Sequence, residues 1–362
     1  MRDLAARILG PAYALAIAVL IGNLLILLNE QSPADVWGLL LASTWGSGYG
    51  IGQVLFKAVP LALAGFSVAL AFRAGLFNVG AEGQMQLGAL ACAVAAAYLP
   101  ASVPGFLALP WAIAAAVAAG AALGALPGWL RARFGAHEVI TTIMLNFVVA
   151  GVCGYALSAG LAEPESLHTK AILPQTQIPR LGAWISALHG SAASWAILIV
   201  AAVALAYRWF FARTRLGLEL RAVGLSETAA EATGVSVSRA RVLAMTLAGG
   251  VAALSATSTV LGYKHAYELG FGAGAGFMGI AVALLGQGHP AGIVVASLVL
   301  GTLSQGGLAI NALVPKDLVD VMQATIILVV VASSSVLHDR VRALRAARRS
   351  SPSLPPKPGE VS

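Results

Sequence analysis

Charged residues are scarce in this chain. Only 10% of its 362 residues are Asp, Glu, Lys or Arg, whereas 59% are hydrophobic. Soluble domains usually contain about 25% charged residues. So few charges cannot cover the surface of a soluble protein of this length. The composition therefore excludes a soluble enzyme and indicates a membrane protein with several spans.

The chain also lacks the residues of common metal and nucleotide sites. Its two cysteines, Cys92 and Cys153, both stand in apolar runs, which predicts small buried residues and excludes a four-ligand zinc site or a disulfide framework. Neither a P-loop string nor an H-E-x-x-H string is present. The glycines of Gly274 to Gly279 match G-x-G-x-x-G but lie in an apolar run, where they predict close helix packing or a helix break. We therefore expect no cofactor and no metal.

Long apolar runs dominate the rest of the sequence and predict an all-α polytopic membrane protein with about ten transmembrane helices. The expected spans are Leu9–Leu28, Ile51–Phe72, Gly75–Leu99, Phe106–Leu130, Val139–Leu161, Ala192–Tyr207, Val242–Tyr263, Phe271–Leu285, Ala291–Leu313 and Leu318–Leu337. Between the first two, Ala34–Ser43 predicts a short external helix at the membrane interface.

The distribution of Lys and Arg predicts that both termini are cytoplasmic. With this orientation the inner side receives 17 of the 22 basic residues and the outer side keeps Lys57, Lys170, Arg180, Lys264 and Lys316. Residues 1–339 then form the transmembrane domain, which includes a cytoplasmic loop at 208–241, and residues 340–362 form a basic, largely disordered cytoplasmic tail. The positive charge of the tail is expected to face anionic lipid, and we expect no nucleic-acid partner.

The first five and the last five segments align as two halves. Because five is odd, the halves would run in opposite directions through the membrane, as in an inverted repeat. The third segment of each half opens with a glycine-rich stretch, Gly75–Gly83 and Gly270–Gly279. Broken helices at matching positions expose backbone groups that can bind a polar solute, so these two stretches are expected to lie near the solute path.

The densest polar cluster within an apolar segment follows Arg73. Asn78, Glu82 and Gln84 belong to it, and Asn146 lies two helical turns after the start of the fifth segment. A charge at a helix centre is unfavourable by about 2.5–3.5 kcal/mol on insertion scales, so Glu82 must face a cavity, a partner or a helix end. Two interpretations remain open: the cluster lines the solute path, or it pairs with Arg73 or neighbouring helices and fixes the fold.

The loop at 208–241 predicts one short, exposed helix. Ser226 is its candidate N-cap, Gly234 its candidate terminator, and Ala229 and Ala230 give it a face of small residues. Such a helix can dock into a groove of a partner protein, although a solvated loop without a partner remains the alternative.

Four strings together resemble the permease subunits of bacterial ABC importers, most closely the nucleoside and simple-sugar branch of the branched-chain amino acid and ribose permeases. They are FRAGLFNVGAEGQ, HEVITTIMLN, LELRAVGLSETAAEATGV and GFMGIAVALLGQGHPAG, and the resemblance covers roughly Lys57 to Leu337. It implies a bacterial cytoplasmic-membrane protein that is not itself an enzyme. It also implies a second permease chain, an external solute-binding protein, and a separate cytoplasmic ATPase that binds ATP and contacts the Gly224–Gly234 segment, including Glu227.

The expected function is import of a small polar solute, most simply a nucleoside, by alternating access. A neutral polar solute needs hydrogen-bond partners and stacking surfaces, which Asn78, Gln84, Asn146 and Phe277 can supply, with Glu82 beside them. Simple sugars and branched-chain amino acids are alternative solutes. A different class, a secondary transporter with Glu82 as ion carrier, also stays open, whereas a membrane enzyme is disfavoured because no His, Cys or Asp cluster converges in the apolar runs.

Overall fold

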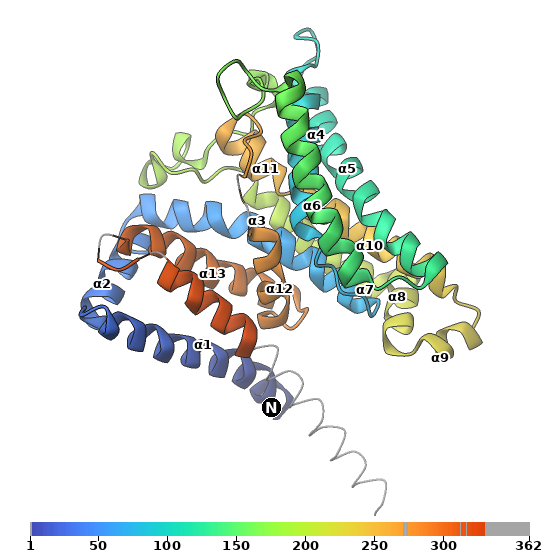
Figure 1. The fold of residues 1–362 in the computed structure, drawn as a ribbon, viewed down its shortest axis with the longest axis horizontal. Coiled ribbons are helices and arrows are strands. Elements are labelled where there is room, and N and C mark those ends of the chain that lie inside the picture. Colours follow the sequence, from blue (N-terminus) through green and yellow to red (C-terminus); the bar gives the residue numbers. More distant parts are fainter. Residues whose placement is uncertain (1, 271, 273, 312, 316, 330–362) are drawn as a thin grey trace, which may run out of the picture.

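The computed structural model describes residues 2–329 except 271, 273, 312 and 316, and in this part of the chain it is helical, without β-strands (Figure 1). The α-helices are α1 (Arg2–Leu28), α2 (Pro33–Thr44), α3 (Gly48–Arg73), α4 (Ala81–Ala97), α5 (Gly105–Phe134), α6 (Glu138–Ala156), α7 (Ile197–Arg213), α8 (Arg215–Leu225), α9 (Glu227–Ala232), α10 (Val237–Ala253), α11 (Ala256–Thr259), α12 (Ala275–Leu285) and α13 (Pro290–Ile310). Residues 317–329 are also helical. Short helical turns are η1 (Leu157–Leu161), η2 (Pro174–Thr176), η3 (Leu181–Ala183), η4 (Ser186–Leu188) and η5 (Val260–Lys264).

Each predicted apolar segment contains helix in its described residues, but residues 75–80 and 192–196 are not helical, so α4 and α7 start later than predicted. Five helices in the described residues are long and apolar enough to cross a membrane, and two bent helix pairs raise the number to as many as seven. The predicted interfacial helix also forms, as α2, and it is bent by 116° from α1. The basic tail at 340–362 lies outside the described residues.

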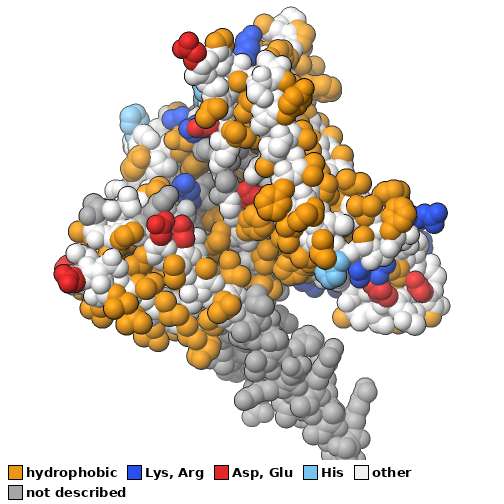
Figure 2. Space-filling view, viewed as in Figure 1, with side chains coloured by type: hydrophobic (Ala, Val, Ile, Leu, Met, Phe, Trp, Pro, Cys, Tyr) orange, Lys and Arg blue, Asp and Glu red, His pale blue; other side chains and the backbone are white. Residues whose placement is uncertain are grey.

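The centre of the bundle is α3, which is buried along most of its length. Helices α10, α12 and α13 pack against it, while α4 and α5 pack against each other and against α10. Figure 2 shows that hydrophobic side chains cover much of the visible surface, whereas charged side chains form separate groups, one of them at the end formed by α8 and α9. This distribution is the one expected of a protein whose flanks face lipid.

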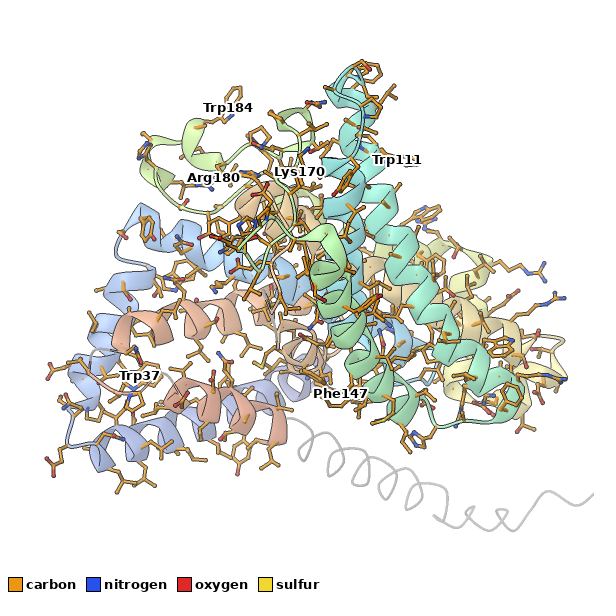
Figure 3. The ribbon with its side chains drawn as sticks, turned by 45° about the horizontal axis from the view of Figure 1, so that its top comes forward. Trp37, Trp111, Phe147, Lys170, Arg180 and Trp184 are labelled. Atoms are coloured by element: carbon orange, nitrogen blue, oxygen red, sulfur yellow. The ribbon has the colours of Figure 1, made fainter. Side chains whose placement is uncertain are left out.

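The two long connections lie at opposite ends of the bundle (Figure 1). The first residue of α3, Gly48, approaches Ala187 in the loop at 162–196, and the last residue, Arg73, approaches Gly224 at the end of α8. Figure 3 shows Lys170, Arg180 and Trp184 on this loop, away from α8 and α9. The 26 residues of α3 thus separate the loop from the α8–α9 connection by roughly 39 Å.

Candidate functional site

The polar cluster predicted from the sequence assembles where the chain enters α4. The predicted span began at Gly75, but the helix begins at Ala81. Residues 74–80 are not helical, and Gly75 among them has a φ of +73°. Asn78 and Gln84 form a reciprocal amide pair: Asn78 Nδ2 donates to Gln84 Oε1 at 2.8 Å, and Gln84 Nε2 donates to Asn78 Oδ1 at 3.1 Å. Asn78 also donates to Ser67 Oγ and accepts from the backbone N–H of Gly80.

Asn146, on α6, completes this cluster from a distant part of the chain. Its Oδ1 accepts from the backbone N–H of Gly83 at 2.9 Å, and its Nδ2 donates to the carbonyl oxygen of Val79 at 3.0 Å. The amides of Asn78, Gln84 and Asn146 are buried, and each has hydrogen-bond partners within the protein. The cluster therefore holds the non-helical entry of α4 against α3 and α6.

Glu82 connects this entry to α12. Its Oε1 accepts from the backbone N–H of Gly274 at 3.0 Å and its Oε2 from that of Gly276 at 2.8 Å, across more than 190 residues of sequence. Gln86 donates a third hydrogen bond to Oε1. The side chain is only 5% exposed. Glu82 thus caps the N-terminus of α12, where unpaired N–H groups and the helix dipole favour an acidic partner.

The N-termini of α4 and α12 are in direct contact. A Cβ atom on Gly276 would lie 2.3 Å from the backbone nitrogen of Glu82, so only glycine allows this approach. From the contact, α4 continues for 17 residues, about 25 Å, towards the loop at 162–196, and α12 continues for 11 residues, about 16 Å, in the other direction.

Arg73 does not pair with the polar cluster, contrary to one of the two predictions for it. Instead, its Nη2 donates to the carbonyl oxygen of Gly288 at 3.1 Å and its Nε to the hydroxyl of Tyr207 at 3.3 Å. Its guanidinium also lies 5.7 Å from the ring centre of Phe211. Arg73 therefore fixes the turn between α12 and α13 to α7, because at the end of α3 it reaches that turn rather than the bundle centre.

Phe277 lies apart from the amide cluster and lines a cavity of about 470 Å³ next to the α4–α12 contact. The cavity is bounded by α3, α11, α12, α13 and the helical residues 317–329. Its lining combines the aromatic side chains of Phe56 and Phe277 with the polar side chains of Lys57, Thr259, Ser304, Asp320 and Gln323. Volumes of roughly 300–1,000 Å³ are typical of pockets for small organic ligands.

Sequence reasoning did not select the charged residues of this cavity. Lys57 was assigned to the outer surface, but it lies nine residues after the start of α3, about 14 Å along that helix. Asp320 was not singled out at all. The signal that could have found them is that both ionisable residues fall inside apolar segments, Ile51–Phe72 and Leu318–Leu337, where charge generally marks function.

The loop at 208–241 forms α8, α9 and the start of α10. Ser226 Oγ accepts from the backbone N–H of Ala229, which confirms the predicted N-cap, and Gly234 ends the helix region with a φ of +83°. Ala229 is exposed, but Ala230 is only 2% exposed, so the expected small-residue surface is wrong for Ala230. Ala230 packs into the core because the six-residue α9 turns that side towards α8 and α10.

Gly224 joins this loop to the centre of the bundle. A Cβ atom on Gly224 would lie 2.3 Å from the carbonyl oxygen of Arg73 and 2.9 Å from the backbone nitrogen of Gly75. The end of α8 is therefore packed directly on the chain that leads into α4. Beside it, Glu227 pairs with Arg241, and Leu225 is 88% exposed, an exposed apolar residue that sequence reasoning did not identify.

Comparison with known proteins identifies the type of protein to which this architecture belongs. The family model described as branched-chain amino acid transport system / permease component matches residues 50–331. The chain belongs to this permease family. The permease is thus a membrane transport component and not an enzyme.

Three of its relatives match nearly the whole permease. The guanosine ABC transporter permease protein NupP of Bacillus subtilis is 35% identical over 91% of this chain and 94% of its own length. The nucleoside ABC transporter permease protein NupB of Lactococcus lactis is 32% identical over 96% of this chain and 97% of its own length. The glucose ABC transporter permease protein TsgB13 of Haloferax volcanii is 32% identical over 91% of this chain and 89% of its own length.

Proposed function

We propose that this permease imports nucleosides through the bacterial cytoplasmic membrane, driven by ATP that a separate ATPase subunit binds and hydrolyses. The observation that carries the proposal is that two relatives named for guanosine and for nucleosides match more than 90% of the chain. A simple sugar is the second candidate solute, because the glucose relative is similar over nearly the same length.

The path of the solute runs past the contact between α4 and α12. Phe277 faces the cavity at this point, and Glu82 holds the first turn of α12, from which Phe277 projects. Asn78, Gln84 and Asn146 fix the entry of α4 to the same contact. In this proposal Phe277 meets the solute, while the other four residues set the geometry of the path.

The packing supports a 5 + 5 inverted repeat. In this repeat α3, α4 and α5 of the first half correspond to α10, α12 and α13 of the second half. The packing of α5 on α10 then corresponds to the packing of α13 on α3. The packing of α4 on α10 likewise corresponds to that of α12 on α3, and all four contacts are present. The two helix N-termini that meet at Glu82 and Gly276 lie on the axis of this repeat. Rocking of the two halves about that contact would open the path alternately to each side.

The proposed topology has ten spans and cytoplasmic termini. It places the α8–α9 connection, with its arginines, in the cytoplasm and the loop at 162–196 outside, which agrees with their positions at opposite ends of the bundle (Figure 1). The short helices α4 and α12 count as broken spans that meet near the middle of the bilayer. The basic tail then faces anionic lipid on the inner surface.

The cytoplasmic ATPase docks on α8 and α9 in this proposal. Glu227, Ala229 and the highly exposed Leu225 form the contact surface. Gly224 transmits its movement to Arg73 and Gly75, on which it is packed, while Ala230 and Gly234 hold the shape of α9. An ATP-driven shift of α8 would thereby reach the entry of α4 without an intervening flexible segment.

Two further partners complete the transporter. An external solute-binding protein docks on the loop at 162–196, where Trp184 is exposed beside the basic residues Lys170 and Arg180 (Figure 3). A second permease chain, identical or related, pairs with this one within the bilayer. Aromatic and Arg side chains are frequent anchors at protein interfaces, which suits Trp184 and Arg180 to this role.

Ion-coupled transport with Glu82 as carrier is disfavoured. Three hydrogen bonds converge on the two carboxylate oxygens of Glu82, and protonation would place a donor against the backbone N–H groups of α12. The relatives are, in addition, named as ABC transporter permeases.

Uptake competition tests the proposed solute. Proteoliposomes containing the complete transporter, purified through a tag on this chain, are supplied with radiolabelled guanosine and internal ATP. We expect ATP-dependent guanosine uptake that unlabelled adenosine or uridine lowers and glucose or leucine does not. Uptake of glucose or leucine with none of guanosine would overturn the proposal.

A further inference from the structure

Two groups of polar side chains lie near the middle of the bundle, and they differ in how they are paired. The amides of Asn78, Gln84 and Asn146 bind one another or nearby backbone groups. In contrast, Lys57, Ser304, Asp320 and Gln323 line the cavity beside Phe277, and within the described residues none of these four has a side-chain hydrogen bond or ion pair. Only the second group is free to bind a solute.

Burial makes these unpaired groups significant. Gln323 is only 8% exposed and Lys57 is half-buried, yet both side chains border the cavity. Charges within a bilayer are rare unless they serve a function. Side chains that serve only the fold would be expected to have hydrogen-bond partners within the protein, as Asn78 does. We therefore expect the polar side chains of the cavity to form hydrogen bonds with a ligand.

The charges of the cavity limit the chemistry of its ligand. One cation, Lys57, and one anion, Asp320, give the lining no net charge, which suits a neutral polar molecule better than a phosphorylated one. Phe277 is 41% exposed and presents an aromatic surface on which a planar ring can stack. Nucleobases of any kind stack on aromatic side chains, because every base has a π-face.

We propose that this cavity binds the solute as a ribonucleoside, with the base on Phe277 and the sugar hydroxyls on the carboxylate of Asp320. The inference rests on the proposed function and adds the residues that recognise each half of the molecule. A carboxylate accepting from ribose hydroxyls is a recurrent mode of nucleotide recognition. Asp320 is exposed, which places it at the open side of the cavity, and Lys57 and Gln323 lie deeper, where they can bind polar edges of the base.

The test compares guanosine with 2′,3′-dideoxyguanosine, which lacks the sugar hydroxyls at issue. Uptake of both is measured in proteoliposomes holding the complete transporter with wild-type permease, Asp320→Ala or the matched control Asp317→Ala. Asp317 lies one turn earlier in the same helical segment and does not line the cavity. Because the external binding protein is the same in all samples, its own selectivity cancels when each variant is compared with wild type.

We expect Asp320→Ala to lower the guanosine-to-dideoxyguanosine uptake ratio about tenfold, as expected for loss of hydrogen bonds to a charged group, and Asp317→Ala to leave the ratio unchanged. Phe277→Leu should raise the KM for both nucleosides, and Phe277→Tyr, which keeps the ring, should raise it less. The control Phe147→Leu, on the exposed surface of α6 (Figure 3), should behave as wild type.

The outcomes separate this inference from the proposed function. If wild-type transporter takes up guanosine but Asp320→Ala lowers uptake of both nucleosides equally, the assignment of the cavity is overturned and the function stands. The same holds if Phe277→Leu leaves KM unchanged. If the wild-type transporter takes up leucine and no nucleoside, with Lys57 and Asp320 facing the two charges of an amino acid, both proposals are overturned.

Discussion

The carboxylate of Glu82 accepts a hydrogen bond from the backbone N–H of Gly276 at 2.8 Å and so fastens the first turn of α12 to the first turn of α4. The same side chain binds the N–H of Gly274. Two helix N-termini that meet in this way would leave several N–H groups unpaired and place two positive dipole ends together. A buried acidic side chain at the contact resolves both problems.

Replacing Glu82 should therefore impair transport more than membrane insertion. We expect Glu82→Ala to lower uptake at least about tenfold while the amount of inserted protein stays near that of wild type, because loss of two charged acceptors destabilises the α4–α12 contact by a few kcal/mol. The measurement pairs uptake with quantification of membrane-embedded protein. Equal losses of uptake and insertion would show that Glu82 serves folding alone.

The amide pair between Asn78 and Gln84 should appear as an energetic coupling. Either single replacement by Ala leaves a buried amide without its partner, at a cost of about 1–3 kcal/mol. The double variant Asn78→Ala/Gln84→Ala should be less destabilised than the sum of the two single variants, by about 0.5–3 kcal/mol. Denaturation of the four proteins in detergent measures this difference, and strictly additive effects would contradict the paired geometry.

Ala229 and Ala230 should respond differently to a large side chain although they are neighbours. Ala229 is exposed, so Ala229→Arg should weaken co-purification of the ATPase without lowering the melting temperature of the permease. Ala230 is buried, so Ala230→Arg should lower the melting temperature itself.

Leu225→Asp provides a second probe of the same surface, with Leu167→Asp on the external loop as its control, since both leucines are highly exposed. We expect only Leu225→Asp to reduce the bound ATPase. If neither Leu225→Asp nor Ala229→Arg changes the ATPase content, docking on α8 and α9 is refuted.

Gly224 should couple ATP hydrolysis to transport. A methyl group at this position would collide with the backbone of Arg73 and Gly75, so Gly224→Ala should displace α8 from the entry of α4. We expect ATP hydrolysis by the complete transporter to continue while uptake falls severalfold. Gly151→Ala is the matched control, because a Cβ atom there meets nothing within 4 Å. Proportional losses of hydrolysis and uptake would argue against coupling at Gly224.

His265 should make the stability of the external side depend on pH. Burial, and then the positive charge of Arg180, lower the pKa of His265 below its ordinary value of 6.5. The unfolded chain then binds a proton that the folded protein does not, so stability is lost as the pH falls through and below about 6.5. The melting temperature of wild type should drop more between about pH 7.5 and about pH 5.5 than that of His265→Asn, which tolerates the φ of +58° and does not titrate. Parallel curves would exclude His265 as the cause.

Local features of the fold were predictable from the sequence because they depend on few neighbouring residues. Apolar runs located the helices, and the cap at Ser226 and the turn at Gly234 followed from short-range rules of helix ends. The break before α4 was also signalled by its glycines. The exact start at Ala81 was not, because Asn146, more than 60 residues away, helps to hold it.

The parts that sequence reasoning missed depend on which side of a helix meets which neighbour. The bond from Glu82 to α12 joins residues more than 190 positions apart, and no periodicity in either segment indicates it. Ala230 lies on a helix too short to show an apolar face. Lys57 and Asp320 line one cavity because α3 packs near the segment at 317–329. The two residues are far apart in the sequence, so the sequence does not indicate that they share a site.

The central claim is that this chain is a gate for nucleosides that depends on a separate ATPase. Its most direct test is guanosine uptake into proteoliposomes holding either the complete transporter or this chain alone, with internal ATP, a proton gradient or a sodium gradient. We predict uptake only by the complete transporter and only with ATP. Gradient-driven uptake by the isolated chain would contradict the claim.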